Sequence, residues 1–212
     1  MKKMLIFGIG GFVGAYLTEE LLQHGYSVFG SDMVPECRLP QGVGYQCVNL
    51  LDPDGVRKLI DEVQPDGIVN LAAISSVGQS WGIPQTTISV NVVGGLNILE
   101  AVRTAGNATK VMFVGSSEEY ETSDRPIDET VELNSNSPYG ISKIAQEQFA
   151  KLYHDHYGMQ VYCVSPFNHT GVGQRNSFVI PSFCEQAAAI ERSGAPGRIM
   201  VGNLAAKRDF SH

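Results

Sequence analysis

A short apolar segment that runs directly into closely spaced glycines most constrains this sequence. Residues 3–7 read Lys-Met-Leu-Ile-Phe, and three glycines follow before an amphipathic stretch begins. A buried strand that turns sharply into a helix needs glycine at the turn, and backbone N–H groups then collect at the positive end of the helix. Such a turn can bind a pyrophosphate, although the spacing here is GxxGxxG rather than GxGxxG. The residues assigned to this dinucleotide-binding turn are Gly8, Gly11, Phe12, Val13 and Gly14.

Five further apolar runs alternate with longer amphipathic stretches along the chain. This alternation is typical of repeated strand–helix units, and it predicts the α/β class: a doubly wound parallel Rossmann sheet with helices on both faces. The expected strands lie near residues 3–7, 27–31, 44–48, 67–71, 111–115 and 160–165. The expected helices cover residues 12–24, 53–63, 84–105 and 138–157, with Gly25 as a C-terminal cap and Asp52 as an N-terminal cap.

The domain organisation follows from this pattern. Residues 1–165 are expected to form the dinucleotide-binding domain, and residues 166–212 the beginning of a small substrate-binding region. Because no further helix or stop signal follows Asp209, we expect a complete substrate domain to need additional residues. The polar stretch 121–137 is too long for an ordinary connection, so it is a candidate active-site loop.

Composition excludes several classes of function. The 212 residues are 43% hydrophobic and carry a net charge of −7, so a sizeable core is expected and a nucleic-acid partner is not. Neither a secretory leader nor a membrane partner is expected. Four cysteines without a CxxC pair suggest neither a disulfide framework nor a zinc site, and they fit a reducing cytoplasm. His154 and His156 are two apart and would point in different directions on a helix, so no metal site is expected.

Asp32 follows the second expected strand, at about the distance from the glycine turn where a carboxylate binds the adenosine ribose. An aspartate there accepts hydrogen bonds from the 2′-hydroxyl and repels a 2′-phosphate. It therefore favours NAD(H) over NADP(H), although NADP(H) remains possible. The alternative is a solvated aspartate at the end of a strand.

Three residue types that can move or hold a proton lie near the carboxyl ends of later strands. Tyr139 and Lys143 are four residues apart, on one face of the expected helix 138–157. A free tyrosine has a pKa of about 10, and a neighbouring cation favours its phenolate, so Tyr139 is a candidate acid or base. Ser116 follows strand 111–115, where its hydroxyl can bond a substrate oxygen. The alternatives are an exposed helix pair and a turn-forming serine pair.

These motifs, taken in order, resemble the extended short-chain dehydrogenase/reductase superfamily of nucleotide-sugar epimerases, dehydratases and reductases. The resemblance covers the whole chain. The sequence departs from the family at Phe7, Asn49 and Asn70, where Thr, Asp and His are usual, which leaves the cofactor affinity open. The matching positions are Gly8, Gly11 and Gly14, Asp32, Leu71-Ala72-Ala73, Asn91, Ser116, Tyr139 with Lys143, and Arg208-Asp209-Phe210.

The resemblance also implies roles for individual residues. Ser116, Tyr139 and Lys143 would form a catalytic triad, in which Tyr139 exchanges the proton and Lys143 also holds the nicotinamide ribose. The implied substrate contacts come from Ser117, Asn168 and Arg208. The implied cofactor contacts, besides the glycine turn, Asp32, Tyr139 and Lys143, come from Asn49, Leu50, Leu71, Ala72, Ala73, Asn91 and Phe167.

Two segments bear on the reaction. Residues 165–174 and 115–120 are similar to those of GDP-4-keto-6-deoxy-mannose reductases, which implies reduction of a C4 ketone with NAD(P)H to give GDP-rhamnose. The closest alternative is a GDP-mannose-type 4,6-dehydratase, because Glu118 stands where those enzymes carry a proton-removing glutamate. A 4-epimerase and a catalytically silent dinucleotide sensor stay open behind both. Family members pair through two long helices, so a homodimer is expected.

Overall fold

The computed structural model describes residues 1–106, 108–121, 123 and 125–211. Thr122 and Asp124 of the expected loop, and His212 at the end of the chain, lie outside the described residues. The chain divides into two compact units, Met1–Ser165 and Pro166–His212, and each is described by itself.

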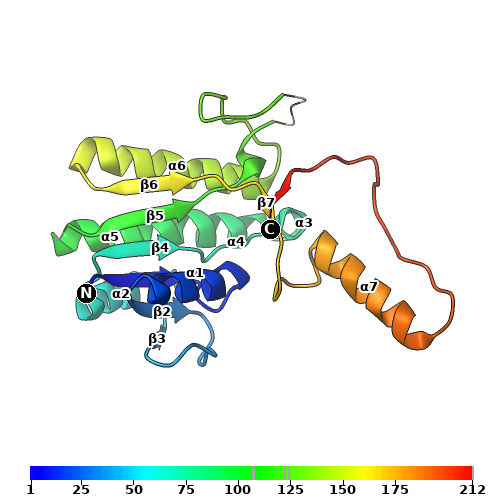
Figure 1. Ribbon diagram of the computed structural model, residues 1–212. Helices are drawn as coiled ribbons and strands as arrows, with labels where there is room; N and C mark the ends of the chain where they lie inside the picture. The colour runs from blue at the N-terminus through cyan, green and yellow to red at the C-terminus, as the bar shows by residue number, and fades with distance from the viewer. Residues whose placement is uncertain (107, 122, 124, 212) are drawn as a thin grey trace. The chain divides into compact units, whose positions relative to one another are not determined.

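The first unit is built on a six-stranded parallel sheet in the order β3-β2-β1-β4-β5-β6 (Figure 1). This is the order of a doubly wound Rossmann sheet, and the order reverses between β1 and β4. All six predicted strands are confirmed to within one residue at each end. Their bounds are β1 Lys3–Phe7, β2 Ser27–Asp32, β3 Gly44–Cys47, β4 Gly67–Asn70, β5 Lys110–Val114 and β6 Val161–Val164.

The helices of the first unit confirm three predicted elements and revise a fourth. The region 84–105 is not one regular α-helix, because a π-helical turn, η1 (Ser89–Val93), separates α4 from α5. Two short helices were not predicted, α3 (Val77–Gly82) and the 3-10 turn η2 (Ser117–Glu119). The remaining bounds are α1 Phe12–Gln23, α2 Pro53–Val63, α4 Pro84–Ile88, α5 Gly94–Ala105 and α6 Pro138–Tyr157.

Both predicted helix caps are present. The Asp52 carboxylate accepts a hydrogen bond of 3.1 Å from the Gly55 backbone N–H at the start of α2. After α1, Gly25 has a φ of +75°, and the N–H groups of Gly25 and Tyr26 bond the carbonyls of Leu22 and Leu21. This pair of bonds is a Schellman cap, which glycine makes without steric cost.

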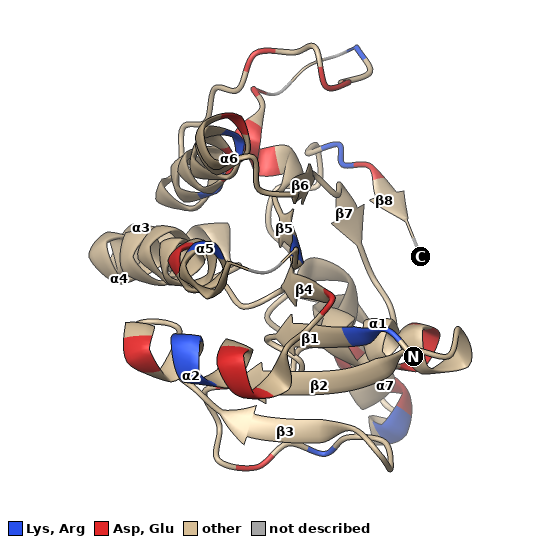
Figure 2. Ribbon diagram, turned by 90° about the vertical axis from the view of Figure 1, so that its left-hand side faces the viewer, with Lys and Arg blue, Asp and Glu red and all other residues tan. Residues whose placement is uncertain are grey.

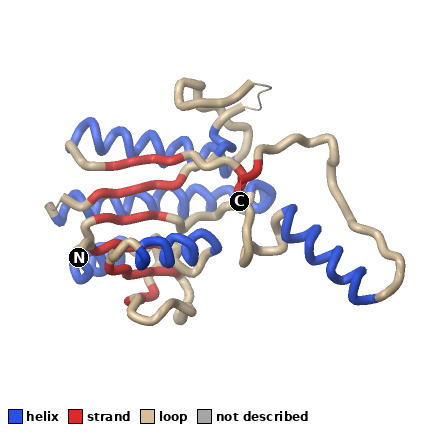
Figure 3. The backbone as a smooth tube through the Cα atoms, in the orientation of Figure 1, coloured by secondary structure: helices blue, strands red, loops and turns tan. Residues whose placement is uncertain are grey.

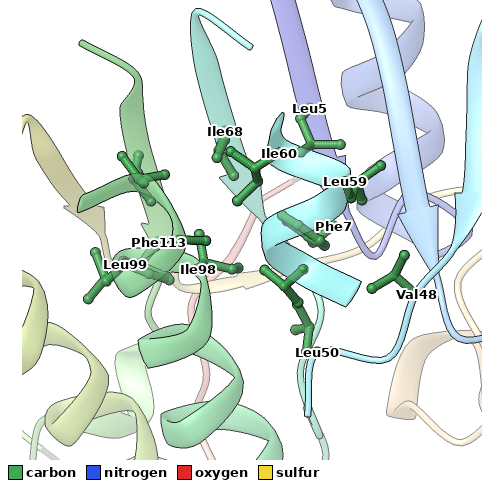
Figure 4. Close-up of a cluster of buried hydrophobic side chains, with 14 of the residues drawn as sticks. Leu5, Phe7, Val48, Leu50, Leu59, Ile60, Ile68, Ile98, Leu99 and Phe113 are labelled. Carbon is green, nitrogen blue, oxygen red and sulfur yellow. The ribbon is translucent and has the colours of Figure 1, made fainter. Parts of the chain in front are cut away.

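Two apolar layers hold the sheet. The larger cluster packs α2, α5 and α6 against one face, and its side chains point toward one another in Figure 4. The smaller cluster places Leu17, Leu21 and Leu22 of α1 against Ile6, Ile9 and Val28. Helices therefore cover both faces of the sheet, with α1 on the side opposite α2, α5 and α6 (Figure 2). Lys and Arg are scattered over many elements rather than gathered into one patch (Figure 2).

The second unit contains α7 (Val179–Ser193) and two short strands, β7 (Asn168–His169) and β8 (Phe210–Ser211), which pair in parallel. No residue of α7 is fully buried. The tube in Figure 3 shows how much of this unit is loop. Within the described part of the chain, no helix combines the length and apolar character needed to cross a bilayer.

Candidate active site

The glycine turn lies at the point where the strand order reverses. Gly8 has a φ of +81°, and a Cβ on it would lie 2.6 Å from the backbone nitrogen of Ala72. A Cβ on Gly14 would lie 2.3 Å from the carbonyl oxygen of Ile9. The first helix starts from Gly11, which has no side chain to cover the helix end. The turn therefore leaves backbone groups open to a phosphate on the carboxyl side of the sheet.

Asp32 lies over this turn. Its Oδ2 accepts a hydrogen bond of 3.2 Å from the Gly10 N–H, and its Oδ1 accepts one of 2.7 Å from the Met33 N–H. The carboxylate is partly exposed at the end of β2, so it can reach a ribose hydroxyl. A narrow glycine cradle with a carboxylate at its rim fits the adenosine half of a nicotinamide dinucleotide.

The segment after β4 forms the other wall of the turn. The Leu71 N–H donates to the Phe7 carbonyl over 2.9 Å, and the Ala72 N–H donates to the Asn70 side chain over 3.2 Å. Leu71, Ala72 and Ala73 are all partly exposed. The backbone of this segment therefore runs beside Gly8, as the resemblance implies.

Asn49 and Leu50, two of the implied cofactor contacts, differ in their surroundings. Asn49 is exposed, and its side chain accepts a hydrogen bond of 3.0 Å from the Leu51 N–H. Leu50 is only 5% exposed and belongs to the apolar core, as Figure 4 shows. A Cβ on Gly94 would lie 3.0 Å from the Leu50 Cβ. The side chain of Leu50 thus serves packing, and its carbonyl accepts a hydrogen bond of 2.7 Å from the Asn97 side chain.

Asn91 lies in the π-helical turn η1 and is fully buried. Its side-chain amide donates to the Ile74 carbonyl over 3.1 Å and to the Ser142 hydroxyl over 2.9 Å, and its Oδ1 accepts from the Ile74 N–H over 2.8 Å. These bonds fasten the segment after β4 to α6. Asn91 therefore positions the walls of the site through protein contacts, and π-helical turns often occur at such places.

Tyr139 and Ser116 meet at the carboxyl end of β5. Tyr139 occupies the first turn of α6 and is 7% exposed, and Ser116 caps η2. Burial raises the pKa of Tyr139, and the hydrogen bond between Tyr139 and Ser116 acts in the opposite direction. The phenol is therefore protonated at neutral pH, contrary to the expectation that a neighbouring cation favours the phenolate. The Glu119 and Glu118 carboxyls raise this pKa further.

Lys143 lies one turn farther along α6 and is 4% exposed. Its ammonium donates a hydrogen bond of 2.7 Å to the Val114 carbonyl and one of 3.4 Å to the Gln146 side chain. Burial lowers the pKa of Lys143 to about 8, while the Glu119 carboxyl opposes that change. The ammonium is directed to the Val114 carbonyl at the end of β5.

Ser117 and Glu118 lie in η2, next to the start of α6. Both side chains are partly buried. A Cβ on Gly140 would lie 2.2 Å from the Glu118 carbonyl oxygen, so the turn packs closely against the helix. Glu118 therefore stands within electrostatic reach of Tyr139.

Several positions in this site carry no motif that could reveal them. Ser80 of α3 accepts a hydrogen bond of 3.2 Å from the Tyr139 N–H. The side-chain amide of Gln146 donates a hydrogen bond of 3.0 Å to the Asn91 carbonyl. Glu119 is fully buried beneath the triad. The adjacent glutamates 118 and 119 look alike in the sequence, and only the fold shows which one is buried.

The three remaining predicted residues belong to the second unit. Asn168 lies in β7, and its side-chain amide donates 3.0 Å to the Asp209 carbonyl. The Arg208 guanidinium donates a hydrogen bond of 2.9 Å to the Lys207 carbonyl. The Phe167 carbonyl lies 3.2 Å from His169 Nδ1. The pairing of β7 with β8 therefore brings Asn168 and the segment after Arg208 together within this unit. Their roles in substrate binding stay predictions.

Comparisons with known proteins agree with the fold and the motifs. The family model GDP-mannose 4,6 dehydratase matches residues 5–212. A GDP-6-deoxy-D-mannose reductase from Pseudomonas aeruginosa is 30% identical over 212 residues, covering 99% of this chain and 66% of the relative. GDP-mannose 4,6 dehydratase 1 from Arabidopsis thaliana is 33% identical over 228 residues, covering 99% and 63%. The chain thus spans less than two thirds of the length of these relatives.

A solved structure of RMD from Pseudomonas aeruginosa in complex with NADPH superimposes with a TM-score of 0.83. It is 28% identical and is matched over 99% of this chain and 69% of the other. The parallel Rossmann-type sheet thus agrees with the family match. This chain belongs to the GDP-mannose 4,6 dehydratase family, within the extended short-chain dehydrogenase/reductase superfamily.

Proposed function

We propose that the protein is an NAD(P)-dependent nucleotide-sugar reductase that reduces the C4 ketone of GDP-4-keto-6-deoxy-mannose to give GDP-rhamnose. The observation that carries the proposal is the buried Tyr139 phenol, which is hydrogen-bonded to the partly exposed Ser116 at the same carboxyl edge of the sheet as the glycine turn. Reduction of a ketone needs a proton donor, and a phenol with a raised pKa stays protonated for that task. An enzyme that must first oxidise its substrate needs a base at the same place.

The residues present divide the work as follows. A bound reduced nicotinamide would supply the hydride for the carbonyl carbon. Tyr139 would donate its phenolic proton to the carbonyl oxygen, and the Ser116 hydroxyl would hold that oxygen by a hydrogen bond. Lys143, whose ammonium lies close beneath the site, would bind the nicotinamide ribose and stabilise the phenolate that remains on Tyr139. Asp32 would bind the adenosine ribose.

A 4,6-dehydratase is the second candidate, and one observation favours it. The Glu118 carboxyl acts on Tyr139 and stands in a turn that packs against Gly140, which suits removal of a proton from a sugar bound there. The relatives include both reductases and dehydratases. A 4-epimerase, and a sensor that binds the dinucleotide without catalysis, have no observation of their own in support.

The test supplies the protein, in its full natural length, with GDP-4-keto-6-deoxy-mannose and NADH, then NADPH, and follows the loss of reduced-nicotinamide absorbance. Stoichiometric loss is expected from the reductase. Conversion of GDP-mannose with no net loss of absorbance would instead indicate the dehydratase. Tyr139→Phe should abolish turnover, and Tyr157→Phe, an exposed tyrosine at the other end of α6, is the matched control. Full activity of Tyr139→Phe would contradict the catalytic assignment.

The proposal includes a homodimer in the cytoplasm. Leu96, Leu99 and Phe149 of the two long helices pack in or against the core. Other large apolar side chains stay exposed on the helical face: Trp81, Ile88, Val93, Ile141 and Leu152. A second copy of the chain is the occupant we propose for this face. Light scattering should give the mass of a dimer, and a monomer mass would exclude it.

The four free cysteines fit a reducing compartment.

A further inference from the structure

A buried carboxyl group lies directly beneath the proposed catalytic residues and has no part in the reaction described above. Glu119 is 0% exposed, although it carries a group that is normally charged at neutral pH. Charged side chains are rarely fully buried unless they are paired, because removing a carboxylate from water is costly. The surroundings of Glu119 therefore need an explanation.

The carboxyl group sits in a close-fitting cradle between the ends of two strands. A Cβ on Gly115 would lie 2.6 Å from Oε1 and 2.9 Å from Oε2, so only glycine leaves room for the carboxyl at the end of β5. At the end of β6, the Ser165 hydroxyl donates a hydrogen bond of 2.9 Å to Oε2 of Glu119. Oε1 makes no hydrogen bond among the described residues. The cradle thus fixes the position of the carboxyl group but provides a hydrogen bond for only one of its two oxygens.

The nearest complementary charge is on Lys143, because its ammonium bonds the carbonyl of Val114 while the Glu119 carboxyl lies against the next residue, Gly115, so that both groups meet the end of β5. The direct partners of the Lys143 ammonium, the Val114 carbonyl and the Gln146 amide, are both neutral. Among the described residues, Glu119 is the carboxyl that raises the pKa of Lys143 against the effect of burial. The Cys163 thiol of β6 acts in the same direction, but burial raises its own pKa to about 12, so it is uncharged at neutral pH.

The other titratable groups that face Glu119 come from three elements. Glu147 of α6 raises the pKa of Glu119, and burial raises the pKa of Glu147 itself. Tyr139 of α6, Tyr120 after η2 and Cys163 of β6 each feel the Glu119 carboxyl. Burial raises the pKa of Glu119, while the Ser165 hydroxyl, the Ser116 backbone N–H and Lys143 lower it. Lys143 is the one cation in this set.

We propose that Glu119 is a positioning residue of the site: its carboxylate is the counter-charge that keeps the buried Lys143 ammonium protonated, and its hydrogen bond with Ser165 ties the end of β6 to the Ser116 turn. A buried ammonium with only neutral partners would readily lose its proton. The consequence for catalysis rests on the proposed function, because it passes through Lys143 to Tyr139. The charge pairing itself does not depend on any substrate.

The test measures the titration of Lys143 directly in the 212-residue chain. Nuclear magnetic resonance of isotope-labelled lysine follows the side-chain signal, which is assigned by its loss in Lys143→Met. The wild-type midpoint is expected at about 8. Glu119→Gln keeps the shape of the side chain and removes its charge, and it should lower that midpoint by about 1 pH unit. Glu132→Gln, an exposed carboxyl in the neighbouring loop, should leave it unchanged.

A second measurement keeps the proposal testable if Glu119→Gln does not fold. Coupling between two sites is reciprocal, so Lys143→Met should raise the midpoint of the Glu119 carboxyl signal by a similar amount. A Lys143 midpoint that is the same in wild type and folded Glu119→Gln, or a Glu119 midpoint unaffected by Lys143→Met, would overturn the proposal. Loss of the proposed function would show differently, as absence of sugar-nucleotide turnover while both titrations remain coupled.

Discussion

The hydroxyl oxygen of Ser80 lies 3.2 Å from the backbone nitrogen of Tyr139, so a short helix that the sequence pattern did not reveal supports the first turn of α6. Ser80 is fully buried and also donates 2.7 Å to the Val77 carbonyl. Ser80→Ala would leave a buried N–H at Tyr139 without this acceptor, at a cost of about 1–3 kcal/mol in the free energy of unfolding. Urea denaturation measures this loss. The exposed Ser193→Ala should change stability by less than about 0.5 kcal/mol, and equal effects of the two variants would contradict the assigned role of Ser80.

Two glycines with similar backbone angles separate steric conflict from backbone strain. Gly8 and Gly25 have φ values of +81° and +75°, but only a Cβ on Gly8 would meet other atoms, 2.6 Å from the Ala72 nitrogen. Gly25→Ala should cost about 1 kcal/mol for the left-handed backbone. Gly8→Ala should cost clearly more, because backbone must also move, and it should weaken dinucleotide binding. Thermal unfolding and NADH titration measure both effects, and equal losses of stability would show that the contact at Ala72 is relieved cheaply.

Burial of Lys143 predicts an unusual dependence of stability on pH. Its pKa falls from 10.5 to about 8 on folding, so the unfolded chain binds more protons between these two values. Stability therefore rises with pH through this window, as the cost of burying the charged amine disappears, by up to about 3 kcal/mol. The comparison is between wild type and Lys143→Met, whose difference in unfolding free energy should change in favour of wild type between pH 8 and pH 10.5. A difference in unfolding free energy that is constant over that range would show that folding does not lower the pKa of the Lys143 amine.

Asp32 should set the preference between the two dinucleotides. Its carboxylate accepts a hydrogen bond of 3.2 Å from the Gly10 N–H, in the place where a 2′-hydroxyl would donate a hydrogen bond to it and a 2′-phosphate would be repelled. Asp32→Ser should weaken NADH binding roughly 10-fold, a loss of about 1.4 kcal/mol, and should improve NADPH binding. Calorimetric titration of both dinucleotides checks this. Asp52→Ser, at the N-terminal cap of α2, is a control that should leave the ratio unchanged.

The sheet was predictable because its strands read as compact apolar runs, even though the edge strands β3 and β6 are partly exposed and only β4 is buried along its whole length. The glycine turn was equally visible, since positions 8 and 14 tolerate no side chain. The π-helical turn at Asn91 was not, because residues 84–105 keep an amphipathic pattern through it. Helix α7 was also missed: it buries no residue completely and carries Pro181 near its start.

Within the site, motifs identified the residues that would touch ligands and missed those that hold them. Ser116, Tyr139 and Lys143 are marked by their order and spacing along the chain. The supporting partners Ser80 and Gln146 come from positions whose importance arises only when α3, η1 and α6 pack together. The raised pKa of Tyr139 likewise depends on burial, which spacing along one helix does not reveal.

The central position of β1 has a consequence for how the chain folds during synthesis. Strand β1 leaves the ribosome first, and β2 follows within a short stretch of chain, so one edge of β1 can pair early. The other edge must wait for β4, which begins at Gly67. At roughly 5–20 residues per second, that edge stays open for several seconds and offers its backbone groups to other nascent chains. A central strand of the finished sheet is thus open along one edge while translation proceeds.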